Sequence, residues 1–249
     1  MSFSVVIPAR YAANRLPGKP LLDIAGKPML QHTYEQAMAS AAEQVYIATD
    51  DERIKQVAED FGASVFMTSP EHRSGTDRIQ EVAEQLKLAG EQVLVNVQAD
   101  EPLLPPVAID QVADNLQQHP QVGIATLCEP ITAQEEIEDP HAVKVVMDKE
   151  GLALYFSRAT IPHQASASAK NCFRHVGIYA YRVAVLNRFV KWPVSELEIS
   201  EKLEQLRALY NGIRIHVAIS TEQIPAGIDT QRDLEAVRAF LASNQGRKQ

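Results

Sequence analysis

Short apolar runs alternate with longer amphipathic segments along the first part of the chain. The apolar runs predict buried β-strands over residues 4–7, 45–48, 65–67 and 93–97. In the amphipathic segments, apolar residues recur at positions i, i+3, i+4 and i+7, which predicts helices over residues 54–61, 79–86 and 109–116. This alternation indicates an α/β fold with a doubly wound, mostly parallel sheet. In such a sheet, ligands bind beyond the carboxyl ends of the strands.

The pattern changes after about residue 139. Two apolar runs, 143–147 and 152–156, flank the sequence Asp148-Lys149-Glu150-Gly151, and together they predict a β-hairpin. Further patterns predict strands over residues 175–181 and 213–219 and helices over residues 199–210 and 234–241.

No linker rich in glycine, serine or proline separates these parts. The sequence therefore favours one domain over residues 1–249 that carries residues 140–182 as a β-rich insertion. Residues 161–170 combine a proline with a run of alanine and serine, so we expect a mobile loop there.

Composition and charge narrow the class of protein. Hydrophobic residues make up 45% and charged residues 22% of the 249 residues, the balance of a soluble globular protein. The net charge of −8 argues against a nucleic-acid-binding surface. Cys128 and Cys172 form neither a disulfide framework nor a metal motif, and no apolar run reaches membrane-spanning length. We therefore expect a cytoplasmic protein that does not associate with a membrane.

One segment departs from the acidic character of the chain. Between residues 7 and 23 the only charged side chains are Arg10, Arg15 and Lys19. Two guanidinium groups and an ammonium suit the triphosphate of a nucleotide, and Pro17-Gly18 allows a sharp turn. On spacing alone, a solvated basic loop is the alternative. Neither a dinucleotide-binding glycine motif nor a P-loop is present.

Acidic residues follow two of the predicted strands. Asp50 follows the second strand and Asp100 the fourth, so both fall where the ligand crevice is expected. Asp100 offers a carboxylate of the kind that Mg²⁺ prefers. The run Asp50-Asp51-Glu52 is interpreted as the cap and first turn of the following helix.

The sequence P-A-R-Y-x-x-x-R-L-P-G-K-P-L closely resembles the nucleotide-binding loop of the 3-deoxy-manno-octulosonate cytidylyltransferases, the CMP-KDO synthetases. Five more segments resemble motifs of this family in the same order: residues 74–78, 98–102, 157–162, 175–181 and 203–207. The resemblance therefore spans nearly the whole chain. Ala12, Ala99 and Thr160 depart from it, because relatives often have glycine at the first two positions and proline at the third.

The resemblance implies a nucleotidyltransferase fold of the GT-A-like kind and a homodimer in which the β-rich insertion takes part. It also implies Mg²⁺ as cofactor and CTP and an acidic 2-keto sugar as substrates. The reaction would transfer CMP to the anomeric hydroxyl of 3-deoxy-D-manno-octulosonate (KDO), with release of pyrophosphate, for lipopolysaccharide biosynthesis. The same chemistry on 8-amino-KDO is the alternative.

The site residues that follow fall into three groups. Nucleotide binding is predicted for Ala9, Arg10, Arg15, Lys19, Ser74 and Gly75, and sugar binding for Gln98, Arg158, His175, Tyr179, Glu204 and Gln205. Metal binding is predicted for Asp100 and, by resemblance, for Asp229, and these two act in catalysis with Arg10 and Lys19.

Several of these residues have plainer interpretations. Asp229 fits an ordinary helix N-cap, His175 a structural histidine, and Glu204 and Gln205 a solvated helix face. Two other functions compete with the transferase. A metal-dependent glycosyltransferase is disfavoured because the chain contains no D-x-D sequence, and a nucleotide sensor without catalysis leaves the acceptor-site candidates unexplained.

Overall fold

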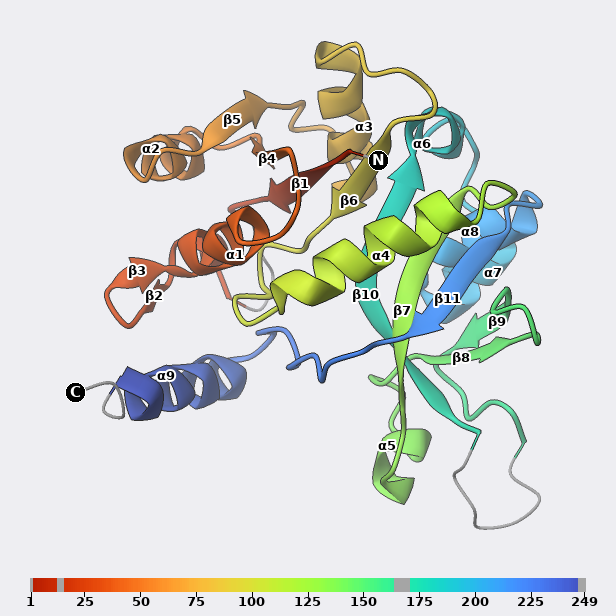
Figure 1. Cartoon of the computed structure of the whole chain (residues 1–249). Coiled ribbons are helices and arrows are strands. Elements are labelled where there is room, and N and C mark those ends of the chain that lie inside the picture. Colours follow the sequence, from red (N-terminus) through yellow and green to blue (C-terminus); the bar gives the residue numbers. More distant parts are fainter. Residues whose placement is uncertain (1, 13–15, 164–170, 246–249) are drawn as a thin grey trace. The chain divides into compact units, whose positions relative to one another are not determined.

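The computed structural model of the chain describes residues 2–12, 16–163 and 171–245, which divide into two compact units (Figure 1). We call residues 2–87, 96–109 and those from 224 onward the parallel unit. Residues 88–95 and 110–223 form the mixed unit. All described residues of the predicted insertion, 140–182, belong to the mixed unit. The single-domain organisation stays a prediction.

The parallel unit contains three parallel strands in the order β1–β4–β5, which are β1 (Phe3–Ala9), β4 (Gln44–Thr49) and β5 (Ser64–Met67). Its helices are α1 (Met29–Met38), α2 (Glu52–Asp60), α3 (Gly75–Gln85) and α9 (Gln231–Gln245). Three short elements follow β1: η1 (Lys19–Leu21), β2 (Asp23–Ile24) and β3 (Lys27–Pro28). The apolar runs explain the strands, because Val5, Val6, Ile7 and Ile47 are completely buried.

The C-terminal helix α9 is held by its apolar face. Leu234 and Val237 pack in one buried cluster with Ile24, Met29 and Ile228. Burial of this face fixes the chain that leads into α9, which includes residue Asp229.

The mixed unit contains β6 (Val93–Asn96), β7 (Ile124–Pro130), β8 (Lys144–Met147), β9 (Ala153–Ser157), β10 (Phe173–Arg182) and β11 (Ile215–Ile219). The order is β11–β7–β10–β6, with β8 paired to β10 and β9 to β8. β7 runs antiparallel to β10 and parallel to β11. The helices are α5 (Gln134–Glu138), α6 (Val183–Phe189), α7 (Glu196–Glu201) and α8 (Gln205–Tyr210), and α4 (Pro106–Gln118) enters this unit from the parallel one.

Most of the predicted elements are confirmed, whereas helices α1, α5 and α6 are absent from the sequence prediction. The helix predicted over 199–210 is wrong as a single element, because Lys202 adopts a left-handed conformation (φ 54°) that ends α7 before α8 begins. β7 is absent from the sequence prediction although it lies between β10 and β11. The predicted mobile loop falls mostly on residues 164–170, which lie outside the described residues.

Within the described residues, no helix has the length and apolar character needed to cross a lipid bilayer.

Candidate active site

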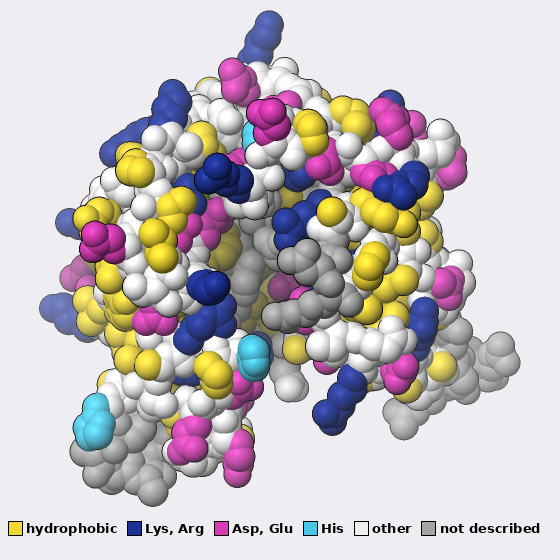
Figure 2. Space-filling model, turned by 180° about the vertical axis from the view of Figure 1, so that it is seen from behind, with side chains coloured by type: hydrophobic (Ala, Val, Ile, Leu, Met, Phe, Trp, Pro, Cys, Tyr) yellow, Lys and Arg dark blue, Asp and Glu magenta, His cyan; other side chains and the backbone are white. Residues whose placement is uncertain are grey.

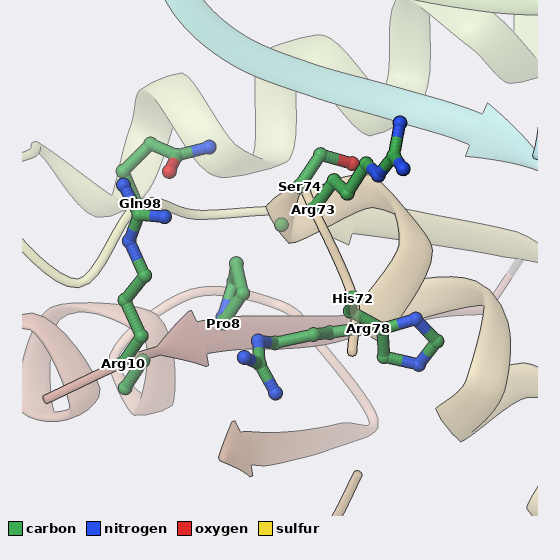
Figure 3. Close-up of a pocket in the computed structure, with 9 residues that line it drawn as sticks. Pro8, Arg10, His72, Arg73, Ser74, Arg78 and Gln98 are labelled. Atoms are coloured by element: carbon green, nitrogen blue, oxygen red, sulfur yellow. The ribbon is translucent and has the colours of Figure 1, made fainter. Parts of the chain in front are cut away.

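A pocket in the parallel unit has a lining rich in positive charge (Figure 3). Its residues come from the end of β1, from the start of α3 and the segment before it, and from the segment after β6. They are Pro8, Ala9, Arg10, His72, Arg73, Ser74, Gly75, Arg78 and Gln98. Because three of these side chains are guanidinium groups, the pocket suits an anionic ligand.

The start of α3 is fixed at this pocket by a capping box. The Ser74 hydroxyl accepts a hydrogen bond from the Asp77 amide at 3.2 Å, and the Ser74 amide donates to the Asp77 carboxylate at 3.1 Å. Gly75 lets the helix approach β1, because a Cβ atom there would lie 3.1 Å from Cγ of Pro8. The positive end of the α3 dipole therefore lies at the pocket, where it favours a negative charge.

Arg78 has a structural part in this pocket. Its guanidinium is buried and donates at 2.7 Å to the Asp50 carboxylate, at 2.7 Å to the Thr68 hydroxyl and at 3.2 Å to the Ser69 carbonyl. Asp50 therefore neutralises Arg78 and does not cap α2. The N-cap is Asp51, whose carboxylate accepts a hydrogen bond from the Arg53 amide, so the predicted cap is confirmed at that position.

Arg10 and Arg73 are the cations that this pocket leaves for a ligand. Both are exposed, and neither guanidinium makes a hydrogen bond or an ion pair with the residues that the structure describes. Figure 3 shows Arg10 and Gln98 on one side of the pocket and Ser74 and Arg73 on another. Arg73 and His72 were not predicted from the sequence, although they directly precede Ser74 of the recognised motif.

His72 is oriented by a carboxylate. Its Nε2 lies 2.5 Å from Oε2 of Glu81, which also accepts a hydrogen bond from the Ser69 amide at 2.9 Å. Burial alone would raise the pKa of Glu81, but these hydrogen bonds lower it. The carboxylate therefore remains ionised and holds the imidazole at the pocket wall.

The positive charge of this pocket is local. On the face shown in Figure 2, basic side chains are interspersed with acidic and apolar ones among the described residues. The acidic chain thus presents guanidinium groups at a defined place, which is the requirement for a small anionic ligand.

Lys19, Asp100 and Asp229 form a second cluster in the parallel unit. Nζ of Lys19 lies 2.5 Å from Oδ2 of Asp100 and 3.0 Å from Oδ1 of Asp229. Burial alone would lower the pKa of Lys19, but the two carboxylates raise it above its ordinary value. Two carboxylates from distant parts of the sequence therefore meet at one cation.

A close backbone contact brings the two carboxylates together. The Ile228 amide donates to the Asp100 carbonyl at 2.9 Å, and a Cβ atom at Gly227 would lie 3.3 Å from the same carbonyl oxygen. Because residue 227 is a glycine, the two backbone segments can approach this closely.

The interpretation of Asp229 as the N-cap of α9 is wrong. Thr230 is the cap: its hydroxyl accepts a hydrogen bond from the Asp233 amide, and its own amide donates to the Asp233 carboxylate. The Asp229 carboxylate instead accepts the hydrogen bond from Lys19.

The donor set of this cluster fits Mg²⁺. One or two carboxylates are typical of a Mg²⁺ site whose remaining ligands are phosphate oxygens and water. Within the described part of the chain, no group of three or more His, Cys, Asp or Glu side chains could hold a metal ion. Asp100 and Asp229 could therefore hold Mg²⁺ only together with ligands from outside the described chain.

The basic loop after β1 turns at Gly18. This glycine has φ 68°, its amide donates to the Tyr11 carbonyl at 3.0 Å, and a Cβ atom there would lie 3.1 Å from the Tyr11 ring. The guanidinium of Arg53 also contacts the Tyr11 ring, 3.3 Å from its centroid. The turn places Lys19 at the start of η1, whereas Arg15 lies outside the described residues.

Arg158, just after the end of β9 in the mixed unit, is held at its backbone and its side chain. Its amide donates to the Glu201 carboxylate at 2.9 Å, and its Nε donates to the Glu201 carbonyl at 2.8 Å. Its Nη1 donates to the Pro140 carbonyl at 2.9 Å. Nη2 makes no hydrogen bond with the described residues, so this nitrogen can donate to a carboxylate.

Lys144 holds the backbone carbonyl of the same residue, Arg158. This side chain is completely buried, and its Nζ donates to the carbonyls of Asp139, Ala142 and Arg158 at 2.8, 2.6 and 2.8 Å. Burial lowers the pKa of Lys144 from its ordinary value. Lys144 and Glu201 therefore fix the Arg158 backbone from its two sides.

His175 and Tyr179 lie close together on β10. Their ring centroids are 5.3 Å apart, and the ring of Phe156 meets the imidazole edge-to-face at 5.1 Å. Burial lowers the pKa of His175 to about 3, and Arg174 adds to the effect. Burial, with Tyr181 and Glu204, raises the pKa of Tyr179. Both groups are therefore neutral hydrogen-bonding side chains at pH 7.

Glu204 and Gln205 lie at the start of α8, whose buried side includes Leu206 and Arg207. Both are half-buried, so the solvated-face interpretation fits neither fully. Arg207 is paired with Glu198 at 2.6 and 2.8 Å and lies 4.0 Å from Glu204. These contacts fix the helix start near Tyr179.

The predicted site residues thus fall into three described groups. Ala9, Arg10, Ser74, Gly75 and Gln98 line the pocket, and Lys19, Asp100 and Asp229 form the carboxylate cluster, all in the parallel unit. Arg158, His175, Tyr179, Glu204 and Gln205 belong to the mixed unit. Gln98, predicted to bind the sugar, lies with the residues predicted to bind the nucleotide.

Two of the departures from the family pattern lie beside these groups. Neither Ala12 nor Ala99 has a positive φ in the structure, so the added methyl groups do not strain the backbone.

Residues 4–215 match a family model described as Cytidylyltransferase. The chain is 54% identical, over 98% of its length and 100% of the relative's, to a 3-deoxy-manno-octulosonate cytidylyltransferase of Saccharophagus degradans. It is 56% identical, with the same coverage, to the protein of that name from Cellvibrio japonicus.

Solved structures agree. A CMP:2-keto-3-deoxy-manno-octonic acid synthetase complexed with CTP superposes with a TM-score of 0.92 at 43% identity, covering 98% of this chain and all of that one. A cytidylyltransferase of Leptospira borgpetersenii, with a TM-score of 0.65 at 17% identity, covers 98% of this chain and 87% of its own and shares the fold. The fold class and the family resemblance predicted from the sequence are confirmed.

Proposed function

Because this chain belongs to the 3-deoxy-manno-octulosonate cytidylyltransferase family, we propose that it transfers CMP from CTP to the anomeric hydroxyl of KDO and releases pyrophosphate. The product would serve lipopolysaccharide biosynthesis. The observation that carries this proposal is the meeting of Asp100 and Asp229 at Lys19, in the same unit as the guanidinium-lined pocket. An anion site together with paired carboxylates is what metal-assisted nucleotidyl transfer requires.

The nucleotide is assigned to the parallel unit. Arg10 and Lys19, together with Arg15, would hold the triphosphate. The start of α3 at Ser74 and Gly75 would add the positive end of the helix dipole and the Gly75 amide. Ala9 also lines the pocket, and its small, nearly buried side chain would leave room for the nucleoside. The similar solved synthetase is complexed with CTP, and this supports CTP as the nucleotide.

Asp100 and Asp229 would hold Mg²⁺. Such an ion would lower the pKa of a coordinated hydroxyl and stabilise negative charge that develops on the phosphates. The hydrogen bonds to Asp100 and Asp229 already hold the Lys19 ammonium in place. From this position it would contact phosphate oxygens of the triphosphate.

The reaction is a direct in-line displacement. The anomeric oxygen forms a bond to the α-phosphorus, the bond between that phosphorus and the bridging oxygen breaks, and pyrophosphate leaves with both bonding electrons. The hydroxyl proton passes to solvent or to a basic oxygen at the site. A nucleotidyl-enzyme adduct detected by intact mass spectrometry would contradict this course.

The acceptor is assigned to the residues that the sequence predicts to bind the sugar. Nη2 of Arg158 would donate to the sugar carboxylate. Hydrogen bonds to the sugar hydroxyls would come from Gln98, His175, Tyr179, Glu204 and Gln205. An 8-amino-KDO acceptor would use the same carboxylate contact and the same chemistry.

We also propose a cytoplasmic homodimer. Cys128 and Cys172 are buried and form no disulfide, which suits a reducing compartment. Leu154, on β9 of the proposed dimerisation insertion, is 62% exposed, as expected of a residue that a second copy covers.

Pyrophosphate release provides the test. We expect release only when CTP, Mg²⁺ and KDO or 8-amino-KDO are combined, in a panel that crosses four nucleoside triphosphates with several 2-keto sugar acids. Tight CTP binding without release from any sugar acid would instead support a nucleotide sensor.

A further inference from the structure

One buried hydroxyl lies beside the proposed acceptor residues without touching solvent. Thr126 is on β7 and is completely buried. Its Oγ1 lies 3.0 Å from Nε2 of His175, 2.7 Å from the Ile178 carbonyl and 3.1 Å from the Val176 carbonyl. Three polar atoms of β10 therefore converge on one side chain of its partner strand.

This convergence results from an irregularity in β10. Val176 pairs with Leu127, and Tyr179 pairs with Thr126, so Gly177 and Ile178 have no partner of their own on β7. The bulge turns the Val176 and Ile178 carbonyls toward the threonine hydroxyl. A regular antiparallel register would not place two carbonyls there.

The protons at this hydroxyl can be assigned. Both carbonyl oxygens can only accept hydrogen bonds. The Thr126 hydroxyl must therefore donate its single proton to them. If that proton pointed at His175 instead, both carbonyls would face oxygen lone pairs at 2.7 and 3.1 Å. The ring nitrogen must therefore be the donor, so Nε2 of His175 carries hydrogen and Nδ1 carries a lone pair.

We propose that Thr126 is a positioning residue that fixes His175 in the Nε2–H tautomer, so that Nδ1 accepts a hydrogen bond from a hydroxyl of the sugar acid. The assignment of His175 to the sugar rests on the proposed function, whereas the tautomer rests on the geometry of the free protein. Sequence reasoning could not find Thr126, because a threonine within an apolar strand gives no signal of its own.

Two further observations agree with this assignment. The edge-to-face contact with Phe156 fixes the plane of the imidazole. Because burial depresses the pKa of His175 to about 3, the ring stays neutral at the pH of the assay and has one donor and one acceptor nitrogen. A neutral ring whose donor is already used can serve a ligand only as an acceptor.

The tautomer is tested by ¹⁵N NMR of the full chain with labelled histidine, with H175Q used to assign the signals. We expect Nε2 protonated and Nδ1 unprotonated in the free wild-type protein and in T126S, which retains the hydroxyl. T126V removes the hydroxyl that accepts from Nε2–H, so its His175 signal should change to a mixture of tautomers. Addition of KDO should move the Nδ1 signal of the wild-type protein.

Kinetics test the positioning role. T126V should raise KM for KDO about tenfold with KM for CTP unchanged, as expected for one hydrogen bond lost from a buried network. T126S should stay close to wild type. An equal rise of both KM values, or a loss of thermal stability equal in T126S and T126V, would show that Thr126 only supports the sheet.

The two proposals fail separately. A protonated Nδ1 in the free wild-type protein would overturn the tautomer assignment, whatever the enzyme turns over. A correct tautomer in a protein that releases no pyrophosphate with any sugar acid would overturn the proposed function, and an Nδ1 signal unmoved by KDO would overturn the contact. If T126V does not fold, the wild-type and T126S spectra still decide the tautomer.

Discussion

Lys19 donates a hydrogen bond to Asp100, which is 81 residues away in sequence, with 2.5 Å between Nζ and Oδ2. The same ammonium also donates to Asp229. This contact joins the basic loop to the carboxylates that would hold the metal. We expect K19M to lower kcat by about 10²-fold or more, because a preorganised charge is lost where the leaving pyrophosphate develops. Steady-state kinetics at saturating CTP and Mg²⁺ measure the effect.

The matched control is K27M. Lys27 also pairs with a carboxylate, that of Glu35, but both are exposed. K27M should leave kcat within about twofold of wild type. Equal kcat values for K19M and K27M would remove Lys19 from the reaction.

Gly227 sets the separation of the two carboxylates. In G227A the new Cβ atom would lie 3.3 Å from the Asp100 carbonyl oxygen, so the segment that carries Asp229 must move by a few tenths of an ångström. We expect the Mg²⁺ concentration for half-maximal activity to rise several-fold, since Mg²⁺ demands near-ideal geometry. Activity measured across a Mg²⁺ series reports this value.

G90A is the control for crowding alone. Its Cβ atom would lie 3.2 Å from Cβ of Ala184 in the mixed unit. Asp100 is not among the atoms that this Cβ would meet. Its Mg²⁺ dependence should match wild type. The same shift in G90A and G227A would mean that the effect is general destabilisation.

Glu201 orients the residue assigned to the sugar carboxylate. In E201Q the side chain loses one acceptor oxygen, so it can no longer accept from both the Ser157 hydroxyl and the Arg158 amide. We expect KM for KDO to rise by about 3- to 10-fold, equivalent to roughly 1 kcal/mol, with KM for CTP unchanged.

E196Q provides the comparison, because Glu196 is exposed on the same helix α7. It should behave as wild type in both KM values. A rise in KM for CTP in E201Q, without a change for KDO, would separate Arg158 from the acceptor.

The sequence was most informative where one local pattern decides the structure. Continuous apolar runs with helices on both sides predict β1, β4 and β5, and the acidic run before α2 predicts its cap at Asp51. The motifs also placed Arg10, Ser74 and Gly75, which share one pocket.

Features that depend on tertiary contacts escaped the sequence. The break between α7 and α8 falls at Lys202, which is left-handed although neither it nor its neighbours in sequence are glycine or proline. The sequence allowed Asp229 to be either a metal ligand or the N-cap of α9. The hydrogen bonds between Thr230 and Asp233 show that Thr230 is the cap. Arg78 lies in a recognised motif, but the sequence does not show that its guanidinium pairs with Asp50.

His216, which is not one of the proposed site residues, makes the free energy of unfolding depend on pH. Its ring stacks on that of His119 with 3.8 Å between centroids, and its buried Nδ1 has no hydrogen-bond partner among the described residues. Burial, with a contribution from His119, lowers the pKa of His216 from 6.5 to about 4. Below pH 6.5 the unfolded chain therefore binds a proton that the native protein does not bind.

The free energy of unfolding should accordingly be fully retained above pH 6.5, fall as the pH decreases toward about 4, and lose nothing further from this group below that value. Each such proton contributes a slope of up to about 1.4 kcal/mol per pH unit. Urea unfolding at pH 7.5 and pH 5 measures the difference, which we expect to shrink in H216Q but not in H141Q, where the replaced histidine is exposed. An unchanged difference in H216Q would mean that His216 titrates alike in the native and unfolded chains.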